Sequence, residues 1–154
     1  MEMPKPGPAH ATLARLAGNG VGAETISPSP WDPAGGVATG RVNNRVAVDG
    51  FAVVQDYEQE RNGAVNMRGV GIFSYDVGGQ CYKMHWTDSM GMGVAEYAGQ
   101  FEGDKLVLSN KGPMGHSRAT FDTGTPGAYR FVMEVSQDGS TWFTFMSGEY
   151  GLKG

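Results

Sequence analysis

Short segments in which apolar and polar residues alternate follow one another along most of the chain, and turns rich in glycine separate them. Alternation with a period of two is typical of strands with one buried face, and Asn62-Gly63 is a strong hairpin signal because both turn positions require positive φ. No connection between these segments is long enough to hold a helix. The pattern predicts ten strands, at about residues 21–27, 37–48, 51–60, 64–75, 81–88, 94–102, 105–110, 114–122, 128–135 and 140–150.

The N-terminal part of the chain has a different pattern. Residues 1–8 are rich in proline and are expected to form a loose arm, whereas Leu13 and Leu16 lie at helical spacing before Gly18, which predicts one short helix. Tight turns pair neighbouring strands antiparallel, and closure of the sheet removes exposed edges. We therefore expect an all-β fold in one domain over residues 9–154: an up-and-down antiparallel β-barrel of about ten strands, with room inside for a small ligand.

The alternation also assigns side chains to the inside or the outside of this barrel. The residues placed inside are 51, 53, 55, 57 and 59 in the third predicted strand, 82, 84, 86 and 88 in the fifth, and 129, 131, 133 and 135 in the ninth. In the strand at residues 114–122, small residues occupy one phase, so His116 and Arg118 in the other phase are placed inside. Methionines on the inner face either adapt to a ligand or simply fill irregular core space. Aromatic residues, methionines and a few polar groups together predict a small-molecule pocket. The expected ligand-binding residues are Gln55, Tyr57, Tyr82, Met84, Trp86, Met114, Arg118, Tyr129, Phe131 and Met133.

Composition and charge narrow the range of partners. The 154 residues carry a formal net charge of −4 and 18% charged residues, with no basic patch, which argues against nucleic acid as a partner. The single cysteine, Cys81, cannot form an internal disulfide, and this favours a reducing cytoplasm. We find no leader-like segment and no apolar run of about 18 residues, so neither secretion nor membrane insertion is expected. A homodimer is compatible with the sequence.

Several longer blocks of the chain resemble the family known as domain of unknown function 1579. They are MPKPGPAHATLARLAGN, SPSPWDPAGGVATGRV, DGFAVVQDYEQERNG, WTDSMG, GPMGHSRATF and SQDGSTWFTFMSGEY. That family is similar to the calycin group, which includes lipocalins, fatty-acid-binding proteins and haem-binding nitrobindins. The resemblance implies a lipocalin-like antiparallel barrel with a short N-terminal helix that closes one end. It implies no established activity.

One position departs from the pattern of such families. After the helix they tend to carry Gly-x-Trp, with the tryptophan packed across the barrel floor, and here Gly20 occupies the tryptophan position. Loss of a buried tryptophan costs about 3–5 kcal/mol when nothing refills the space. Either Trp31, Trp142 or Met146 repacks the floor, or the missing side chain enlarges the pocket and makes Gly20 part of a ligand site.

Few residues offer catalytic or metal chemistry. Of the three histidines only His116 is placed inside, which is too few for a zinc site. The nitrobindin resemblance makes it a candidate axial haem ligand, and a structural histidine is the simpler interpretation. Asp88 either caps a turn or forms an acid–base pair with His116, beside Arg118, at the pocket mouth. No phosphate-binding or dinucleotide motif is present, and we predict no cofactor and no metal.

Two classes of function are compatible with this barrel. The first is binding of a small, hydrophobic or aromatic molecule inside it. The second is a cofactor-free enzyme that uses the same cavity, such as a cyclase, isomerase or lyase of a hydrophobic biosynthetic intermediate, with His116 and Asp88 as catalytic residues. A third interpretation is a barrel filled by its own side chains that acts through its surface. The fold alone does not choose among them.

Overall fold

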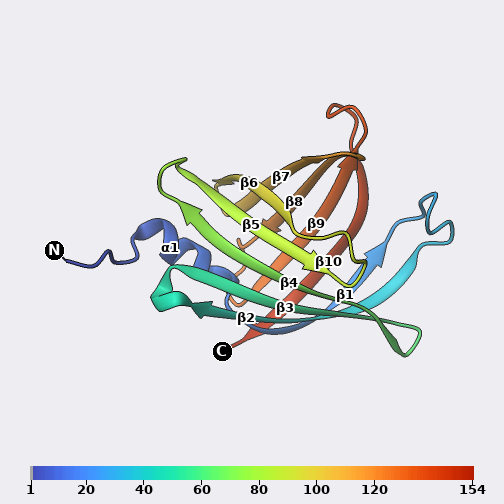
Figure 1. Ribbon diagram of the computed structural model, residues 1–154. Coiled ribbons are helices and arrows are strands. Elements are labelled where there is room, and N and C mark those ends of the chain that lie inside the picture. The colour runs from blue at the N-terminus through green and yellow to red at the C-terminus, as the bar shows by residue number, and fades with distance from the viewer. Residues whose placement is uncertain (1) are drawn as a thin grey trace.

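Ten antiparallel strands close into a barrel in the computed structural model, which describes residues 2–154 (Figure 1). Each strand pairs with the next one along the chain, and β10 pairs with β1 to complete the ring. The all-β up-and-down architecture expected from the alternation is confirmed. The strands are β1 (Gly18–Ile26), β2 (Gly36–Ala47), β3 (Ala52–Arg61), β4 (Ala64–Asp76), β5 (Cys81–Asp88), β6 (Ala95–Glu102), β7 (Lys105–Gly112), β8 (Gly115–Asp122), β9 (Ala128–Ser136) and β10 (Phe143–Lys153).

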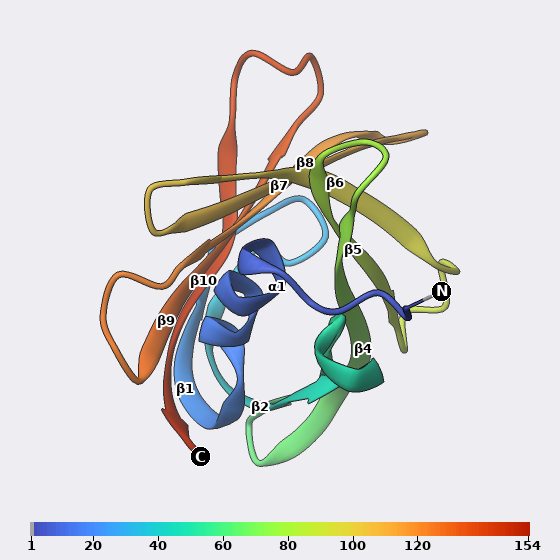
Figure 2. The same cartoon turned by 90° about the vertical axis from the view of Figure 1, so that its left-hand side faces the viewer.

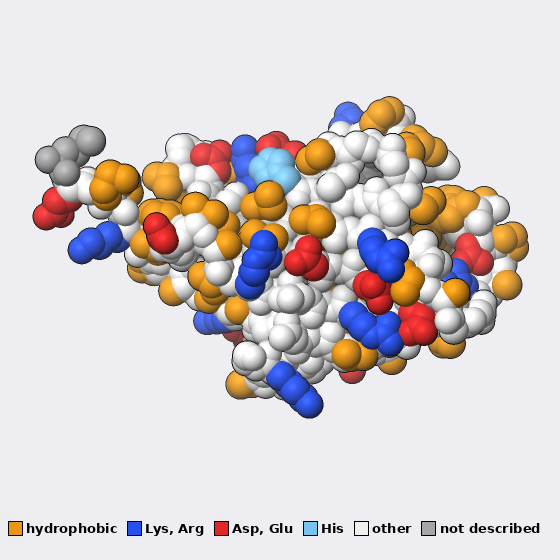
Figure 3. Space-filling view, turned by 60° about the horizontal axis from the view of Figure 1, so that its bottom comes forward, with side chains coloured by type: hydrophobic (Ala, Val, Ile, Leu, Met, Phe, Trp, Pro, Cys, Tyr) orange, Lys and Arg blue, Asp and Glu red, His pale blue; other side chains and the backbone are white. Residues whose placement is uncertain are grey.

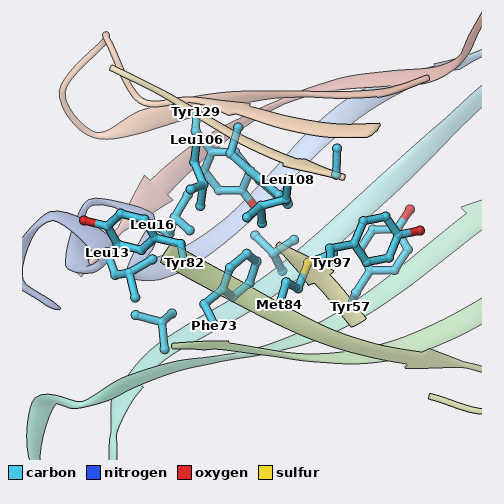
Figure 4. Packing of buried hydrophobic residues seen from close by; sticks show 14 of the residues in the cluster. Leu13, Leu16, Tyr57, Phe73, Tyr82, Met84, Tyr97, Leu106, Leu108 and Tyr129 are labelled. Atoms are coloured by element: carbon cyan, nitrogen blue, oxygen red, sulfur yellow. The ribbon is translucent and has the colours of Figure 1, made fainter. Parts of the chain in front are cut away.

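A short helical segment closes one end of the barrel (Figure 2). It consists of α1 (Pro8–Leu13) and the single turn η1 (Ala14–Leu16), and a second short turn, η2 (Val48–Gly50), joins β2 to β3. Leu13 and Leu16, the two residues that predict the helix, are each 1% exposed and pack into the core at this end (Figure 4). The Tyr82 hydroxyl of β5 donates a hydrogen bond to the Ala9 carbonyl at 3.2 Å, which fixes the helix to the barrel wall.

The faces predicted for β3, β5 and β9 are confirmed. In each of these strands the more apolar phase points into the barrel, and the acidic residues of β3 point outward. Alternation succeeds here because one face of each strand packs against the core while the other meets solvent. The inward side chains are Val53, Gln55, Tyr57 and Gln59 of β3, Tyr82, Met84, Trp86 and Asp88 of β5, and Tyr129, Phe131 and Met133 of β9.

The face predicted for β8 is wrong. Ala119 is 0% exposed and Phe121 is 3% exposed, so the phase that holds the small residues points inward. Ala119 pairs with Leu108 of β7 and with Met133 of β9, and these larger neighbours occupy the space beside it. A small residue therefore compensates for large ones inside the barrel, and the longer polar side chains of β8 lie on the outside.

Two register shifts change the phase of the inner face. One lies between Thr144 and Met146 of β10, and the other lies at Gln59 and Glu60 where β3 pairs with β4. A bulge inserts an extra residue into one strand and bends it. Consecutive side chains near each shift consequently reach the interior, as Phe145 and Met146 do in β10.

The outer surface carries charges of both signs. Figure 3 shows basic and acidic side chains interspersed on the face formed by the lower strands of Figure 1. Arg41 and Arg68 both reach Glu58, at 3.7 and 3.4 Å, and Arg41 also contacts Glu60 at 2.8 Å. Paired surface charges of this kind make only small contributions to stability. Within residues 2–154, no helix combines the length and the apolar character needed to cross a membrane.

Candidate functional site

The barrel encloses a cavity of about 590 Å³. This volume lies within the range of about 300–1,000 Å³ that is usual for small-molecule sites. Its lining is mostly aromatic and methionine-rich, with a limited number of polar groups. The lining residues are Ile26, Trp31, Asp32, Val42, Gln55, Tyr57, Gln59, Arg61, Asn66, Met67, Met84, Trp86, Asp88, Met90, Tyr97, Phe121, Tyr129, Phe131, Met133, Phe145, Met146 and Tyr150.

A buried carboxylate, Glu24 of β1, organises one wall of the cavity. Glu24 is 1% exposed, and its Oε1 and Oε2 accept from the Tyr57 hydroxyl at 2.9 and 2.7 Å. The Tyr150 hydroxyl also donates to Oε2, and Gln59 Nε2 donates to Oε1 at 3.0 Å. Burial, reinforced by the neighbouring Glu24, raises the pKa of Tyr57 and of Tyr150 well above the ordinary value for tyrosine. The two phenols therefore stay protonated at neutral pH and act as donors to the carboxylate.

Glycines on the neighbouring strands make room for this cluster. Gly40 of β2 pairs with Gly22 of β1, and Gly148 of β10 pairs with Glu24 itself. A Cβ atom at Gly40 would overlap the Glu24 carboxylate, and one at Gly148 would lie 2.6 Å from the Tyr150 hydroxyl oxygen. The absence of side chains at these positions lets a carboxylate and a phenol ring lie flat against the inner surface of the sheet.

A second polar cluster lies around the Tyr129 hydroxyl. This oxygen accepts hydrogen bonds from Asn44 Nδ2 at 3.3 Å and from Gln55 Nε2 at 3.1 Å, and Asn44 Nδ2 also donates to the Leu16 carbonyl at 2.9 Å. Burial, with a smaller contribution from Glu24, raises the pKa of Tyr129 to about 12. Asn44 Oδ1 is buried and has no hydrogen-bond partner among the described residues. The cluster links the closing helical segment to the cavity wall.

A less polar part of the wall is built around Trp86, whose ring centroid lies 5.9 Å from that of Tyr57. Its indole ring lies over Gly69 and Gly71 of β4, where a Cβ atom at Gly71 would come within 3.1 Å of the ring. Trp86 Nε1 donates to Asp88 Oδ2 at 2.8 Å, and the Met90 backbone N–H donates to Asp88 Oδ1 at 3.0 Å. Both oxygens of Asp88 are therefore engaged in holding the ring and the following turn, which is the turn-capping role.

The end of the barrel opposite α1 forms the mouth of the cavity. Arg61 Nη1 contacts Asp32 Oδ2 at 2.7 Å, and Arg61 Nη2 donates to the Gly35 carbonyl at 3.0 Å. These contacts hold the β1–β2 loop over the end of β3. The Trp31 ring packs against Phe145, with ring centroids 5.6 Å apart, while much of it remains exposed. The mouth is therefore aromatic, and its one basic side chain among the lining residues is already paired.

A larger hollow, of about 1200 Å³, lies on the outer side of β1 to β4 and is more open to solvent. Its outward-facing charges include Arg41, Glu58 and Arg68, which pair with one another. A hollow that is open to solvent buries little of a small ligand, and these three charges are already paired. We therefore treat the enclosed cavity as the candidate site.

Eight of the residues that the sequence places in a site do line this cavity. Figure 4 shows three of them, Tyr57, Met84 and Tyr129, directed into the interior from different strands. Whether they bind a ligand stays a prediction. The eight are Gln55, Tyr57, Met84, Trp86, Asp88, Tyr129, Phe131 and Met133.

Four other predicted residues lie elsewhere. Tyr82 is buried beside the closing helix rather than in the cavity. Met114 is 86% exposed at the turn between β7 and β8. Arg118 lies on the outside, where it pairs with Glu134 at 3.0 and 3.1 Å, and its guanidinium lies 4.1 Å from the centre of the Trp142 ring. His116 also lies on the outer face, and its ring packs near Trp142.

The acid–base pair of Asp88 with His116 is therefore not formed, because the two side chains lie on opposite faces of the barrel wall. His116 is also unable to reach the cavity as an axial ligand from this position. The cause of both errors is the phase of β8, which the small residues of the strand predict incorrectly. Within residues 2–154, no group of three or more His, Cys, Asp or Glu side chains is arranged to hold a metal ion.

The proposal that Gly20 opens the pocket is also wrong. A Cβ atom at Gly20 would lie 2.9 Å from the Gly151 carbonyl oxygen and 3.1 Å from side-chain atoms of both Leu152 and Val42. The floor is therefore repacked, and Gly20 is not among the residues that line the cavity. Leu152 and Val42 fill the space, rather than the tryptophans or Met146.

Three residues of the polar wall carry no site prediction from the sequence. Glu24, Gln59 and Tyr150 are not predicted as site residues, although Gln59 is correctly placed on the inner face. A signal exists for Glu24: in β1 it shares a phase with Gly20, Gly22 and Ile26, which is the buried phase. An acidic residue in the buried phase of a strand is unusual, because burial of a carboxylate is costly unless hydrogen-bond donors or a cation contact it.

The closed ten-stranded barrel with its short N-terminal helix fits a calycin-like fold. The chain belongs to the family described as "Protein of unknown function (DUF1579)", which it matches over residues 5–151. The family resemblance inferred from the sequence blocks is confirmed. No curated protein matches the chain.

Two solved structures share the fold. One is Rv2717c from M. tuberculosis, with a TM-score of 0.71 and 12% sequence identity, covering 96% of this chain and 99% of that one. The other is the S-type phycobiliprotein lyase CPES from Guillardia theta, with a TM-score of 0.62 and 10% identity, covering 95% and 93% of the two chains. At these identities the likeness establishes the fold alone.

Proposed function

We propose that this protein binds a small, partly hydrophobic ligand inside its barrel. The observation that carries the proposal is the cavity of about 590 Å³ inside the barrel, whose lining combines aromatic and methionine side chains with a few polar groups. A barrel filled by its own side chains would leave no such space. Sites of this size bury most of the surface of a small molecule, and a few placed polar groups set its orientation.

The composition of the lining supports a ligand with aromatic or extended apolar parts. Five methionines reach the cavity, and their flexible side chains adapt to different shapes. Trp86 and Tyr57 present rings to the interior with centroids 5.9 Å apart. The likeness of fold to a phycobiliprotein lyase is compatible with this proposal, because it shows that a protein with that printed activity uses a barrel of this type.

A second candidate is a cofactor-free enzyme, such as a cyclase, isomerase or lyase, that acts in the same cavity. The observation that favours it is the buried carboxylate of Glu24 with its two phenol donors. A carboxylate and a phenol in hydrogen-bond contact can exchange a proton with a bound molecule. In this version of the proposal, Glu24, Tyr57 and Tyr150 replace His116 and Asp88 as the acid–base groups.

Native mass spectrometry of the protein purified from its own host tests the binding proposal. We expect a species heavier than the bare chain, which loses a small molecule on activation. Met133→Trp, which places a larger side chain in the cavity, should reduce that species at least about tenfold by excluding volume. Met114→Trp is the matched control, because it makes the same change at an exposed turn and should leave the bound fraction unchanged.

Equal loss in both variants would point to a general folding defect, which circular dichroism would reveal. Retention of the heavier species in a folded Met133→Trp variant would place the ligand outside the cavity and overturn the proposal.

A further inference from the structure

The polar wall of the cavity is built from hydrogen-bond acceptors. All three groups that contact Glu24 donate to it, so both of its carboxyl oxygens act as acceptors. The hydroxyl protons of Tyr57 and Tyr150 are directed to that carboxylate. The Tyr57 oxygen already accepts from Gln59 Nε2 at 3.1 Å. To a molecule in the cavity the two phenol oxygens can therefore offer only their remaining lone pairs. Tyr57, Tyr150 and Gln59 line the cavity, and Glu24 lies behind them.

Positive charge does not balance this wall. Among the residues that line the cavity, Arg61 is the one basic side chain, and it is engaged with Asp32 at the mouth. Asp88 contributes a further carboxylate beside Trp86. Away from the Arg61–Asp32 pair, the ionisable carboxyl groups of the interior are Asp88 and Glu24, and no cation of the described chain faces them.

The field of Glu24 extends across the cavity wall. Burial is the main cause of the raised pKa of Tyr129, and the charge of Glu24 adds to it. A negative charge at the Tyr129 oxygen is thus disfavoured, and a ligand anion placed beside it would meet the same repulsion. Tyr129 accepts from Asn44 and Gln55, and its own hydrogen can satisfy a neutral oxygen of a ligand.

The aromatic side chains favour the opposite charge. Faces of Trp86, Tyr57 and Tyr150 surround the space, and aromatic faces attract cations when water is excluded. Electron-rich rings, acceptor oxygens and an uncompensated carboxylate therefore act in the same direction.

We propose that the cavity selects a mainly apolar ligand that carries an N–H or O–H donor, such as an aromatic amine or alcohol, and that it rejects organic carboxylates of the same size. The donor group faces Tyr150 and Tyr57, and the apolar body lies against Trp86 and the methionines. This inference rests on the proposed function, because it assigns a ligand class to that same cavity.

A matched set of probes tests this selectivity with the full chain. Naphthylmethylamine is cationic at neutral pH, naphthylmethanol is a neutral donor, methylnaphthalene has no donor, and naphthylacetate is an anion of similar bulk. Binding is followed by calorimetry and by quenching of tryptophan fluorescence. We expect the amine and the alcohol to bind at least about tenfold more tightly than the anion, because like charges repel strongly in a poorly solvated site.

Two variants locate the source of the selectivity. Glu24→Gln removes the buried charge with little change in size and should bring the affinity for the anion to within about threefold of that for the alcohol. Glu149→Gln is the matched control: it makes the same change one residue before Tyr150, on the outside, where the carboxylate is 73% exposed and pairs with Arg130. It should leave the ratio unchanged.

The outcomes separate the two proposals. Equal binding of anion and amine to the wild-type protein would overturn the selectivity while leaving ligand binding intact. A ratio that changes equally in both variants would assign the effect to net charge and would also overturn it. If none of the four probes binds, the binding function and the selectivity both fail. The wild-type comparison is sufficient even if Glu24→Gln does not fold.

Discussion

Removal of the Tyr150 hydroxyl should cost far more stability than removal of a comparable hydroxyl elsewhere. Tyr150 is buried and donates to the Glu24 carboxylate. A hydrogen bond to a charged group contributes about 1.5–3 kcal/mol, against about 0.5–1.5 kcal/mol for a neutral one. We therefore expect Tyr150→Phe to lower the free energy of unfolding by about 2 kcal/mol. The control is Tyr82→Phe, since Tyr82 is 7% exposed and its hydroxyl donates to a neutral carbonyl.

A double-mutant cycle with Glu24→Gln isolates the interaction. The single variant Glu24→Gln turns one acceptor oxygen into a donor and leaves at least one buried donor unpaired, at a cost of about 1–3 kcal/mol. Because Tyr150 and Glu24 are in direct contact, the two changes should not be additive, and a coupling energy of about 1–2 kcal/mol is expected. Urea unfolding followed by tryptophan fluorescence measures each variant.

The expected change is large enough to measure. With a urea dependence of about 1–3 kcal/mol per molar, a loss of 2 kcal/mol moves the midpoint by roughly 1 M. Equal effects of Tyr150→Phe and Tyr82→Phe, together with a coupling energy near zero, would refute the claim that Glu24 is a charged acceptor for Tyr150.

Three further predictions concern packing and titration. Gly40→Ala should destabilise the fold by about 1–3 kcal/mol because the new methyl group meets the Glu24 carboxylate. Gly151→Ala is the control and should have little effect, since a methyl group at that position has no atom within 4 Å; equal unfolding midpoints for the two variants would contradict this. Raising the pH should destabilise the protein, because the pKa of Tyr129 rises from 10.0 to about 12 on folding. The contribution of this shift to the free energy of unfolding is complete below pH 10 and is lost between pH 10 and about 12. Absorbance of tyrosinate against pH, compared between the native and the urea-unfolded chain, measures this, and identical curves would count against it. Gly20→Trp should destabilise rather than stabilise the fold, because its Cβ position already lies in tight contact with Leu152, Val42 and the Gly151 carbonyl; a higher thermal midpoint would show that the floor still contains space.

The architecture could be predicted from the sequence because it depends on local signals. Glycine-bearing turns such as Asn62-Gly63 fix the hairpins, and period-two alternation identifies the strands with one buried face. β3, β5 and β9 follow this rule, so most of the residues that they contribute to the cavity are among the predicted ones. The exceptions are Gln59 and Arg61 of β3, which the prediction omits, and Tyr82 of β5, which it includes although it does not line the cavity. The helical segment formed by α1 and η1 is likewise indicated by Leu13 and Leu16 at helical spacing.

The polar wall could not be predicted, because it depends on contacts between residues far apart in the chain. Glu24 and Tyr150 are 126 positions apart and meet only because β1 closes the barrel against β10. The phase of β8 depends on the bulk of Leu108 and Met133 on the two neighbouring strands, which alternation within β8 does not contain. Local sequence patterns therefore determine which segments are strands and how they are joined. Closure of the barrel alone decides which side chains meet inside it, because complementarity of volume and the pairing of buried charge are properties of several strands at once.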